Sequence, residues 1–115
     1  MAAKYVFDND FVLLKDDRKL VVTITIKYVQ HGVTNLYLDG KPIEEGKVGS
    51  FSKEVAGVSG NELKVVTTVA DLNANVDNTG LEVSIVGGSE EKRKSYDQMA
   101  DHKDIVTYHL TYTLF

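Results

Sequence analysis

The sequence predicts an all-β protein, a two-layer antiparallel β-sandwich of about seven to nine strands, immunoglobulin-like or jelly-roll-like in type. Segment 19–29 (KLVVTITIKYV) is the first observation, because its β-branched and aromatic residues alternate strictly between two faces. Segment 105–115 repeats the alternation, with Val106, Tyr108, Leu110, Tyr112 and Leu114 in step. Turn-forming residues separate the apolar segments, which is the third observation. An open β-barrel is the alternative arrangement of the same strands.

The first segment, residues 5–14, contains two short apolar runs divided by Asp8-Asn9-Asp10. Asp and Asn side chains compete for backbone hydrogen bonds, so the division predicts a turn or a bulge. A polar turn over residues 16–18 is then expected to lead into the long strand 19–29. Gln30-His31-Gly32 is expected to end that strand.

The middle of the chain predicts several shorter strands. Residues 34–39 alternate, and Asp39-Gly40 favours a hairpin turn after them. Pro42 has no amide hydrogen, so the returning strand is expected to be short or to lie at a sheet edge. Residues 48–55 predict a weak strand. Residues 63–72 are fairly apolar on both sides, which predicts a central strand covered on both faces.

The last third of the chain contains two clear strands and one polar segment. Residues 81–86 alternate and Gly87-Gly88 ends them. Residues 89–104 (SEEKRKSYDQMADHKD) are strongly polar and of mixed charge, which predicts a short helix or a polar loop. Residues 105–115 form the final strand, and its threonine-rich face is expected to be exposed to solvent.

The composition indicates one folded domain over residues 1–115 with a modest core, since 43% of the residues are hydrophobic and 26% are charged. The net charge of −4 argues against a nucleic-acid partner and against docking on anionic lipid by charge alone. The absence of cysteine excludes disulfides, thiolate metal sites and a cysteine nucleophile.

The sequence also bears on membranes and location. No run approaches the roughly 20 apolar residues of a transmembrane helix, so no transmembrane segment is expected. The first ten residues, MAAKYVFDND, contain no apolar core of a signal peptide, which favours a cytoplasmic location. Secretion after processing or by another route is the alternative.

Segment 71–82 (DLNANVDNTGLE) is the candidate metal site. Counting Asp71 as position one, the oxygen-bearing residues Asn73, Asn75, Asp77, Thr79 and Glu82 fall at the ligand positions of an EF-hand loop. Ca²⁺ is therefore the candidate cofactor. Val76 stands where that loop needs glycine, and the flanking segments read as strands. The alternative is a long hairpin without an ion, with its tip at residues 77–80.

Three further residues are candidate contacts for a ligand or a partner. Tyr37 is out of step with the apolar residues of its strand, so its ring is expected to point outward. Tyr96 and His102 lie in the polar segment 89–104, where a flap over one end of the sandwich would carry them.

No catalytic motif is present. The sequence contains no Gly-x-Ser-x-Gly, no Ser-x-x-Lys and no histidine pair at metal-ligand spacing, so an enzyme is not expected. We expect a non-catalytic binding or structural module that acts through protein–protein contacts, including self-association as a homo-oligomer through sheet edges. The alternative is calcium-assisted binding of carbohydrate or lipid headgroups through segment 71–82.

Overall fold

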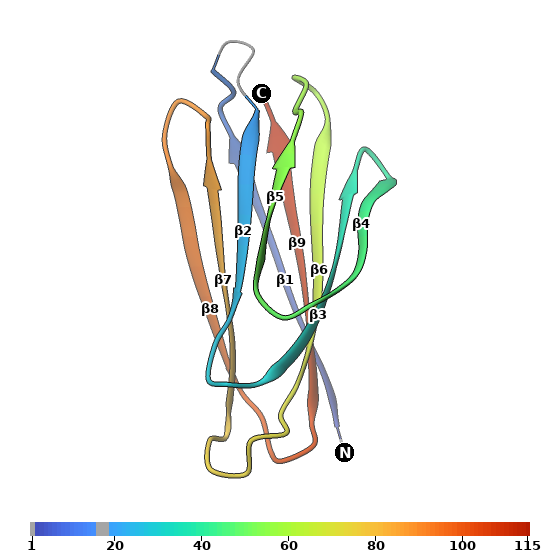
Figure 1. Ribbon diagram of the computed structural model, residues 1–115, viewed down its shortest axis with the longest axis vertical. Coiled ribbons are helices and arrows are strands. Elements are labelled where there is room, and N and C mark those ends of the chain that lie inside the picture. Colours follow the sequence, from blue (N-terminus) through green and yellow to red (C-terminus); the bar gives the residue numbers. More distant parts are fainter. Residues whose placement is uncertain (1, 16–18) are drawn as a thin grey trace.

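The computed structural model describes residues 2–15 and 19–115, which form nine strands in two layers (Figure 1). In chain order, the strands are β1 (Ala3–Val12), β2 (Leu20–Ile26), β3 (His31–Leu38), β4 (Lys41–Val48), β5 (Phe51–Val55), β6 (Glu62–Ala70), β7 (Asn78–Val86), β8 (Lys92–Met99) and β9 (Ile105–Leu114). The predicted all-β sandwich is confirmed. The described residues contain no helix, and hence none that could span a membrane. The turn expected at residues 16–18 lies outside them.

The strands form a five-stranded sheet in the order β1-β9-β6-β3-β4 and a four-stranded sheet in the order β5-β2-β7-β8. Neighbouring strands pair antiparallel in both sheets, except that β1 runs parallel to β9. The sandwich is elongated, 46 × 23 × 21 Å. Because β1 and β9 are parallel, the two ends of the chain lie at opposite ends of the long axis (Figure 1).

The core lies between the sheets because alternate residues of each strand point inward. Buried apolar side chains come from both layers: Val12, Leu20, Val22, Ile24, Leu36, Val55, Leu63, Val65, Val69, Leu81, Val83, Ile85, Ala100, Val106, Tyr108, Leu110, Tyr112 and Leu114. Two facing threonines of the five-stranded sheet, Thr34 on β3 and Thr67 on β6, are also fully buried. Their hydroxyls lie 2.8 Å apart and bind each other, which satisfies both in the apolar interior.

One open side of the sandwich, between β1 and β8, is closed by the polar seam (Asp8, Asp10, Lys92, Lys94 and Tyr96). Lys94 Nζ lies 2.6 Å from Asp8 Oδ2, and the Tyr96 hydroxyl donates to the same oxygen at 2.7 Å. Lys92 Nζ lies 3.4 Å from Asp10 Oδ1. The seam thus joins the edge strands of the two sheets through side chains rather than a backbone ladder.

The seam shifts the pKa values of its members. The hydrogen bond from Lys94, and then the one from Tyr96, lowers the pKa of Asp8 below its ordinary value. Burial acts to raise the pKa of Asp10, but the Phe11 amide and the charge of Lys92 outweigh it, and the net direction is downward. The bond to Asp8 raises the pKa of Lys94. Each shift favours the ionised form that the seam uses.

The seam corrects two expectations. Residues 5–14 are not two runs divided by a turn, since β1 passes continuously through Asp8 and Asp10. Residues 89–104 contain no helix and are not simply a loop, since they form the edge strand β8 and the turns beside it. In both cases, charged side chains that suggested a break or a solvated segment point inward toward opposite charge.

The long strand expected over residues 19–29 ends earlier, at Ile26. Tyr28 and Val29 adopt positive φ angles of 61° and 53°, which turn the chain toward β3. Tyr28 therefore leaves the inward face on which alternation had placed it, and its hydroxyl donates to Asp97 Oδ1. That hydrogen bond is the first cause of the lowered pKa of Asp97.

Two other expectations concern position within the five-stranded sheet. The strand containing Pro42, β4, lies at a sheet edge as predicted. The strand expected over residues 63–72, β6, is central as predicted, between β9 and β3. It is not covered on both faces, however, because Lys64 and Thr68 are exposed on its outer side.

Candidate functional site

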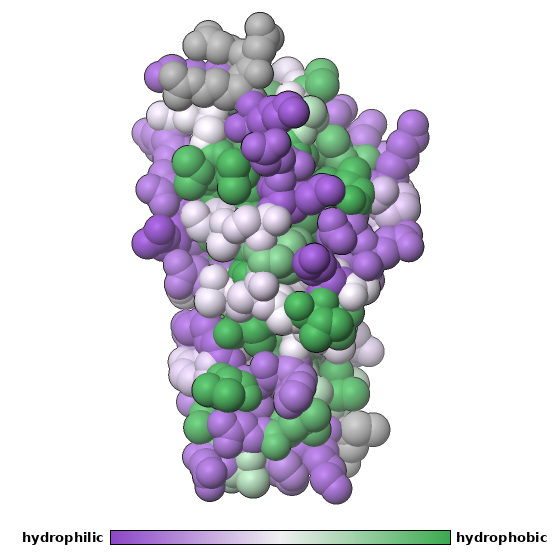
Figure 2. Space-filling view, viewed as in Figure 1, coloured by the Kyte–Doolittle hydropathy of each residue, from purple (hydrophilic) through white to green (hydrophobic). Residues whose placement is uncertain are grey.

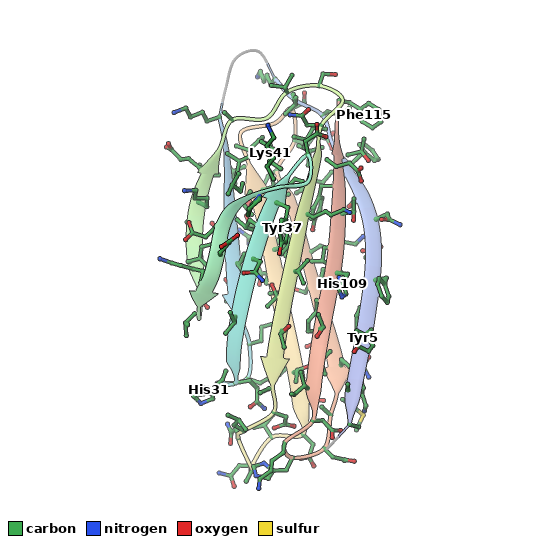
Figure 3. All side chains as sticks on the ribbon, turned by 90° about the vertical axis from the view of Figure 1, so that its right-hand side faces the viewer. Tyr5, His31, Tyr37, Lys41, His109 and Phe115 are labelled. Atoms are coloured by element: carbon green, nitrogen blue, oxygen red, sulfur yellow. The ribbon has the colours of Figure 1, made fainter. Side chains whose placement is uncertain are left out.

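The outer side of the five-stranded sheet carries a set of aromatic and hydroxyl side chains that we call the aromatic face. It comprises the outward-pointing residues of four strands: Ala3, Tyr5, Phe7, Asn9 and Phe11 of β1; Ile105, Thr107, His109, Thr111 and Thr113 of β9; Glu62, Lys64, Val66, Thr68 and Ala70 of β6; and His31, Val33, Asn35 and Tyr37 of β3. Figure 3 looks onto this face, with Tyr5, His109 and Tyr37 on three of its strands.

Strand register places these residues in rows across the sheet. Phe7 pairs with His109, His109 with Val66, and Val66 with Asn35. The neighbouring row begins with Tyr5, which pairs with Thr107. Residues far apart in the sequence therefore form one continuous surface.

Three rings gather at the β1 edge of the aromatic face. The Phe7 ring and the His109 imidazole stack with centroids 4.9 Å apart and an interplanar angle of 11°. The Tyr5 ring lies 6.5 Å from Phe7 and 6.3 Å from His109. The rings remain open to water, since Tyr5 is 62% exposed and Phe7 71%. Such a group of exposed rings is typical of a surface that another molecule covers.

A shallow hollow of about 180 Å³ lies beside the rings. It is lined by Phe7, Lys64, Val66, His109, Leu110 and Thr111. Sites that enclose a small molecule usually measure roughly 300–1,000 Å³. This hollow is therefore of a size to accept a side chain from a facing surface rather than to enclose a cofactor or a substrate.

A second hollow, of about 350 Å³, lies on the other open side of the sandwich. It is lined by Leu38, Ile43, Lys53, Glu54, Val55 and Ala56. The Lys53 ammonium lies 3.5 Å from the Glu44 carboxylate, so this charged group of the lining is already paired within the chain. None of these six lining residues is aromatic, so among the described residues this hollow has no counterpart of the ring cluster on the aromatic face.

The aromatic face differs in charge from the outer face of the four-stranded sheet, although the edge strand β4 beside it has the exposed charged residues Lys41, Glu45 and Lys47. On the aromatic face only Glu62 and Lys64 carry a full charge, on neighbouring outward positions of β6. The outer face of the four-stranded sheet carries ion pairs instead, such as Arg93 with Glu82 at 3.3 Å. Figure 2 shows hydrophilic residues spread over that second face, with apolar residues in separate patches. Low charge and exposed rings together are typical of the centre of a protein–protein interface.

The structure does not bring the six residues of the candidate metal site together. Asp71 is buried, and its Oδ1 accepts a hydrogen bond of 2.9 Å from Gln30 Nε2. Thr79 is also buried, with its hydroxyl 2.8 Å from that of Tyr108. Glu82 lies on the outer face of β7, paired with Arg93.

Of the remaining members, Asn73 Oδ1 accepts the Asn75 amide at 3.2 Å, and Asp77 is exposed. Among the described residues, no three acidic or histidine side chains are grouped as metal ligands. The alternative expectation, a long hairpin, is wrong. β6 and β7 belong to different sheets, so residues 71–77 cross between the layers.

Gln30 organises this end of the sandwich. Its Nε2 donates to Asp71 Oδ1 and to the carbonyls of Val76 and Asn78, and its Oε1 accepts the amides of Leu72 and Asn73, both at 3.0 Å. Asp71 Oδ2 is buried and has no partner among the described residues. The start of the candidate segment is therefore held by the side-chain amide of Gln30.

The other candidate contacts lie in three different places. Tyr37 is half-buried on the aromatic face, in the row of Lys64. Tyr96 points into the polar seam, where its ring centroid is 6.2 Å from that of Tyr108. The pKa of Tyr96 is raised, mainly by burial and secondly by the hydrogen bond to Asp8. His102 is exposed in the turn between β8 and β9.

The ring cluster was missed at the level of sequence. The signal available was the spacing of Tyr5, Phe7 and Phe11, which places all three on one side of an uninterrupted strand. The assumed break at Asp8-Asn9-Asp10 concealed it.

The chain is thus a small β-sandwich domain with one charge-poor, aromatic outer face. A scan against protein-family models finds no match, and searches of curated proteins and of solved structures find none either.

Proposed function

We propose that the protein is a non-catalytic binding or assembly module that acts through protein–protein contacts made by the aromatic face. The exposed stack of Phe7 on His109, flanked by Tyr5, is the observation that supports this proposal. Aromatic side chains supply much of the binding energy at protein interfaces when a partner excludes water from them.

The surroundings of the rings agree with a protein partner. The hollow beside Phe7 and His109 has room for one inserted side chain. The threonine hydroxyls of β9 and β6 offer hydrogen bonds without the cost of burying a charge.

Calcium-assisted binding of carbohydrate or lipid headgroups through segment 71–82 is the second candidate. The unpartnered, buried Asp71 Oδ2 favours it. The position of Glu82 speaks against the calcium site. Glu82 lies on the outer face of the four-stranded sheet, paired with Arg93, whereas Asp71 directly follows a strand of the five-stranded sheet. We therefore place the contact surface on the aromatic face.

Site-specific photocrosslinking tests the proposal. A benzophenone amino acid is introduced at Thr68, on the aromatic face, and in a matched variant at Thr25, an exposed threonine on the outer side of the four-stranded sheet. We expect irradiation in the native cells to yield protein adducts from position 68, and few from position 25. Adducts formed equally from both positions, or none from position 68, would contradict the proposal.

A loss-of-contact variant complements this experiment. Phe7→Ser in the position-68 background removes the most exposed ring and should abolish the adduct. Val86→Ser, an exposed apolar residue of β7, is the matched control and should leave it unchanged.

A further inference from the structure

The four edge strands of the sandwich differ in how well they resist pairing with another strand. β4 contains Pro42 and irregular register with β3, β5 has only five residues, and β8 carries Lys92, Arg93 and Lys94. Prolines, irregularities, short length and basic side chains all discourage strand addition. β1 has inward charges at Asp8 and Asp10, but Lys94 and Lys92 of the same chain neutralise them. Its ten residues include no proline, and its outer side carries exposed rings, which makes it the least protected edge.

Only part of the β1 edge is open. The carbonyls of Ala2 and Val12 accept backbone amides from Ile105 and Phe115, on the β9 side. In a parallel ladder every second residue of a strand bonds to the same neighbour, so the even-numbered residues of β1 bond to β9. The odd-numbered residues therefore direct their backbone groups away from the sheet. Among these, the Asn9 amide donates to Asp8 Oδ1 at 3.0 Å and the Phe11 amide to Asp10 Oδ1 at 2.8 Å. No side chain of the described residues caps the amides of Tyr5 and Phe7 in this way.

We propose that the protein self-associates by antiparallel pairing of β1 with β1 of a second copy, in the register that sets Tyr5 opposite Phe7. The central hydrogen bonds then come from Tyr5 and Phe7, the residues whose amides are uncapped. This inference goes beyond the proposed function, because pairing at the β1 edge extends the sheet and leaves the outer side of the aromatic face open to another partner.

Side-chain complementarity selects this register. Tyr5 faces Phe7 twice across the two-fold axis, so rings meet rings. Lys4, whose Nζ donates to the Met99 carbonyl, faces Asp8, which also pairs with Lys94, so opposite charges meet on both sides of the axis. A register centred on Asp8 would bring two carboxylates together. A register centred on Phe7 would set Tyr5 against Asn9 and bring the Asn9 amide, which Asp8 already caps, next to the axis. In the proposed register that amide lies further out, in the Ala3–Asn9 pair.

The proposed pairing would form a dimer with one continuous sheet. It joins two five-stranded sheets into one continuous sheet through an isologous contact, in which the same residues of both copies meet. His109 stacks behind Phe7 in each copy, so the rings of both copies form one group across the axis.

Single-cysteine crosslinking tests the register, because the chain contains no cysteine of its own. Val6 lies on the two-fold axis in a pair without backbone hydrogen bonds, where Cα atoms are about 4.5 Å apart and a disulfide fits. Under mild oxidation, Val6→Cys should give a covalent dimer of twice 12.7 kDa, while Asn9→Cys on the same strand should not. A dimer from Phe7→Cys or Asn9→Cys rather than from Val6→Cys would overturn the register.

Val6 is half-buried, so a second test avoids it. Mixing Lys4→Cys protein with Asp8→Cys protein should give a mixed disulfide, since these residues face each other. In equilibrium sedimentation, Lys4→Glu should raise the dimer dissociation constant about tenfold, because two attractive pairs become repulsive. Lys47→Glu, the same charge change at an exposed position on β4, the opposite edge strand of the sheet, is the control and should have no such effect.

The outcomes separate the two proposals. A chain that stays monomeric over the whole concentration series overturns self-association. If photocrosslinking at Thr68 then still yields a protein adduct, the proposed function stands and only self-association is wrong.

Discussion

Gln30 and Asp71, 41 positions apart in the sequence, bind each other through their side chains at 2.9 Å in the interior of the protein. The same glutamine also holds the amides of Leu72 and Asn73. One amide group thus fixes the crossing from β6 to β7.

We expect Gln30→Ala to lower the free energy of unfolding by about 2–4 kcal/mol, because it leaves a buried carboxylate and two amides without their partner. Gln98→Ala is the matched control, since the side chain of Gln98 makes only an exposed bond to the Met99 carbonyl. Urea unfolding of the three proteins measures the difference. Equal stability of the two variants would show that water replaces Gln30 without cost.

Calcium is not expected to stabilise the protein, because Asp71 is engaged by Gln30 and Glu82 by Arg93. The measurement is the melting temperature in millimolar calcium against EDTA. An ion that binds only the folded state must raise this temperature. A rise that disappears in both Asp71→Asn and Asp77→Ala would instead support the calcium-assisted alternative.

Acid should weaken the polar seam. The pKa of Asp8 lies below 3.8, so its ion pair stabilises the folded state above about pH 4, and this contribution is lost as the pH falls through the folded-state pKa. The raised pKa of Lys94 acts in the opposite sense, and its contribution is present below pH 10.5 and lost above the folded-state value. The seam's contribution should therefore be flat between about pH 5 and 9.

Asp8→Asn checks this dependence. The variant should be less stable than the natural chain at pH 7, and the difference should shrink as the pH falls below about 4. Glu90→Gln, at an exposed position beside β8, is the control and should leave the pH profile unchanged. A constant difference at every pH would mean that the ionisation of Asp8 contributes nothing.

The buried pair Thr34–Thr67 should show strong coupling. Thr34→Val alone leaves the Thr67 hydroxyl without a partner and should cost about 1–3 kcal/mol. The double variant Thr34→Val/Thr67→Val removes both hydroxyls and should cost much less than the sum of the single changes. A double-mutant cycle from denaturant unfolding measures the coupling, and simple additivity would contradict it.

The sequence was sufficient for the sandwich because alternation is a local signal. In the stretch Leu20–Ile26 each inward residue is apolar, whichever strand lies beside it. The end of that strand could not be predicted from the sequence. Nothing in the residues Tyr28 and Val29 indicates that both adopt positive φ.

The errors at residues 5–14 and 89–104 share one physical cause, which is that charge pairing between distant strands cannot be inferred from either strand alone. Asp8 read as a break and Lys94 as part of a solvated segment until the fold brought them 2.6 Å apart. The aromatic face depends in the same way on register, since His109 stacks on Phe7 only because β1 and β9 pair in parallel.

The parallel pairing of β1 with β9 also determines how the domain responds to mechanical tension. The register runs from Ala3 opposite Ile105 to Val12 opposite Leu114, so force applied at the two chain ends slides one strand along the other. In this shear geometry the hydrogen bonds of the ladder share the force, whereas in a peeled pair they break in succession. Pulling between cysteines placed at Ala3 and Phe115 should therefore need more force than pulling between cysteines at Ala3 and Ile105. As a link in a longer chain, the domain would act as a stiff element about 46 Å long.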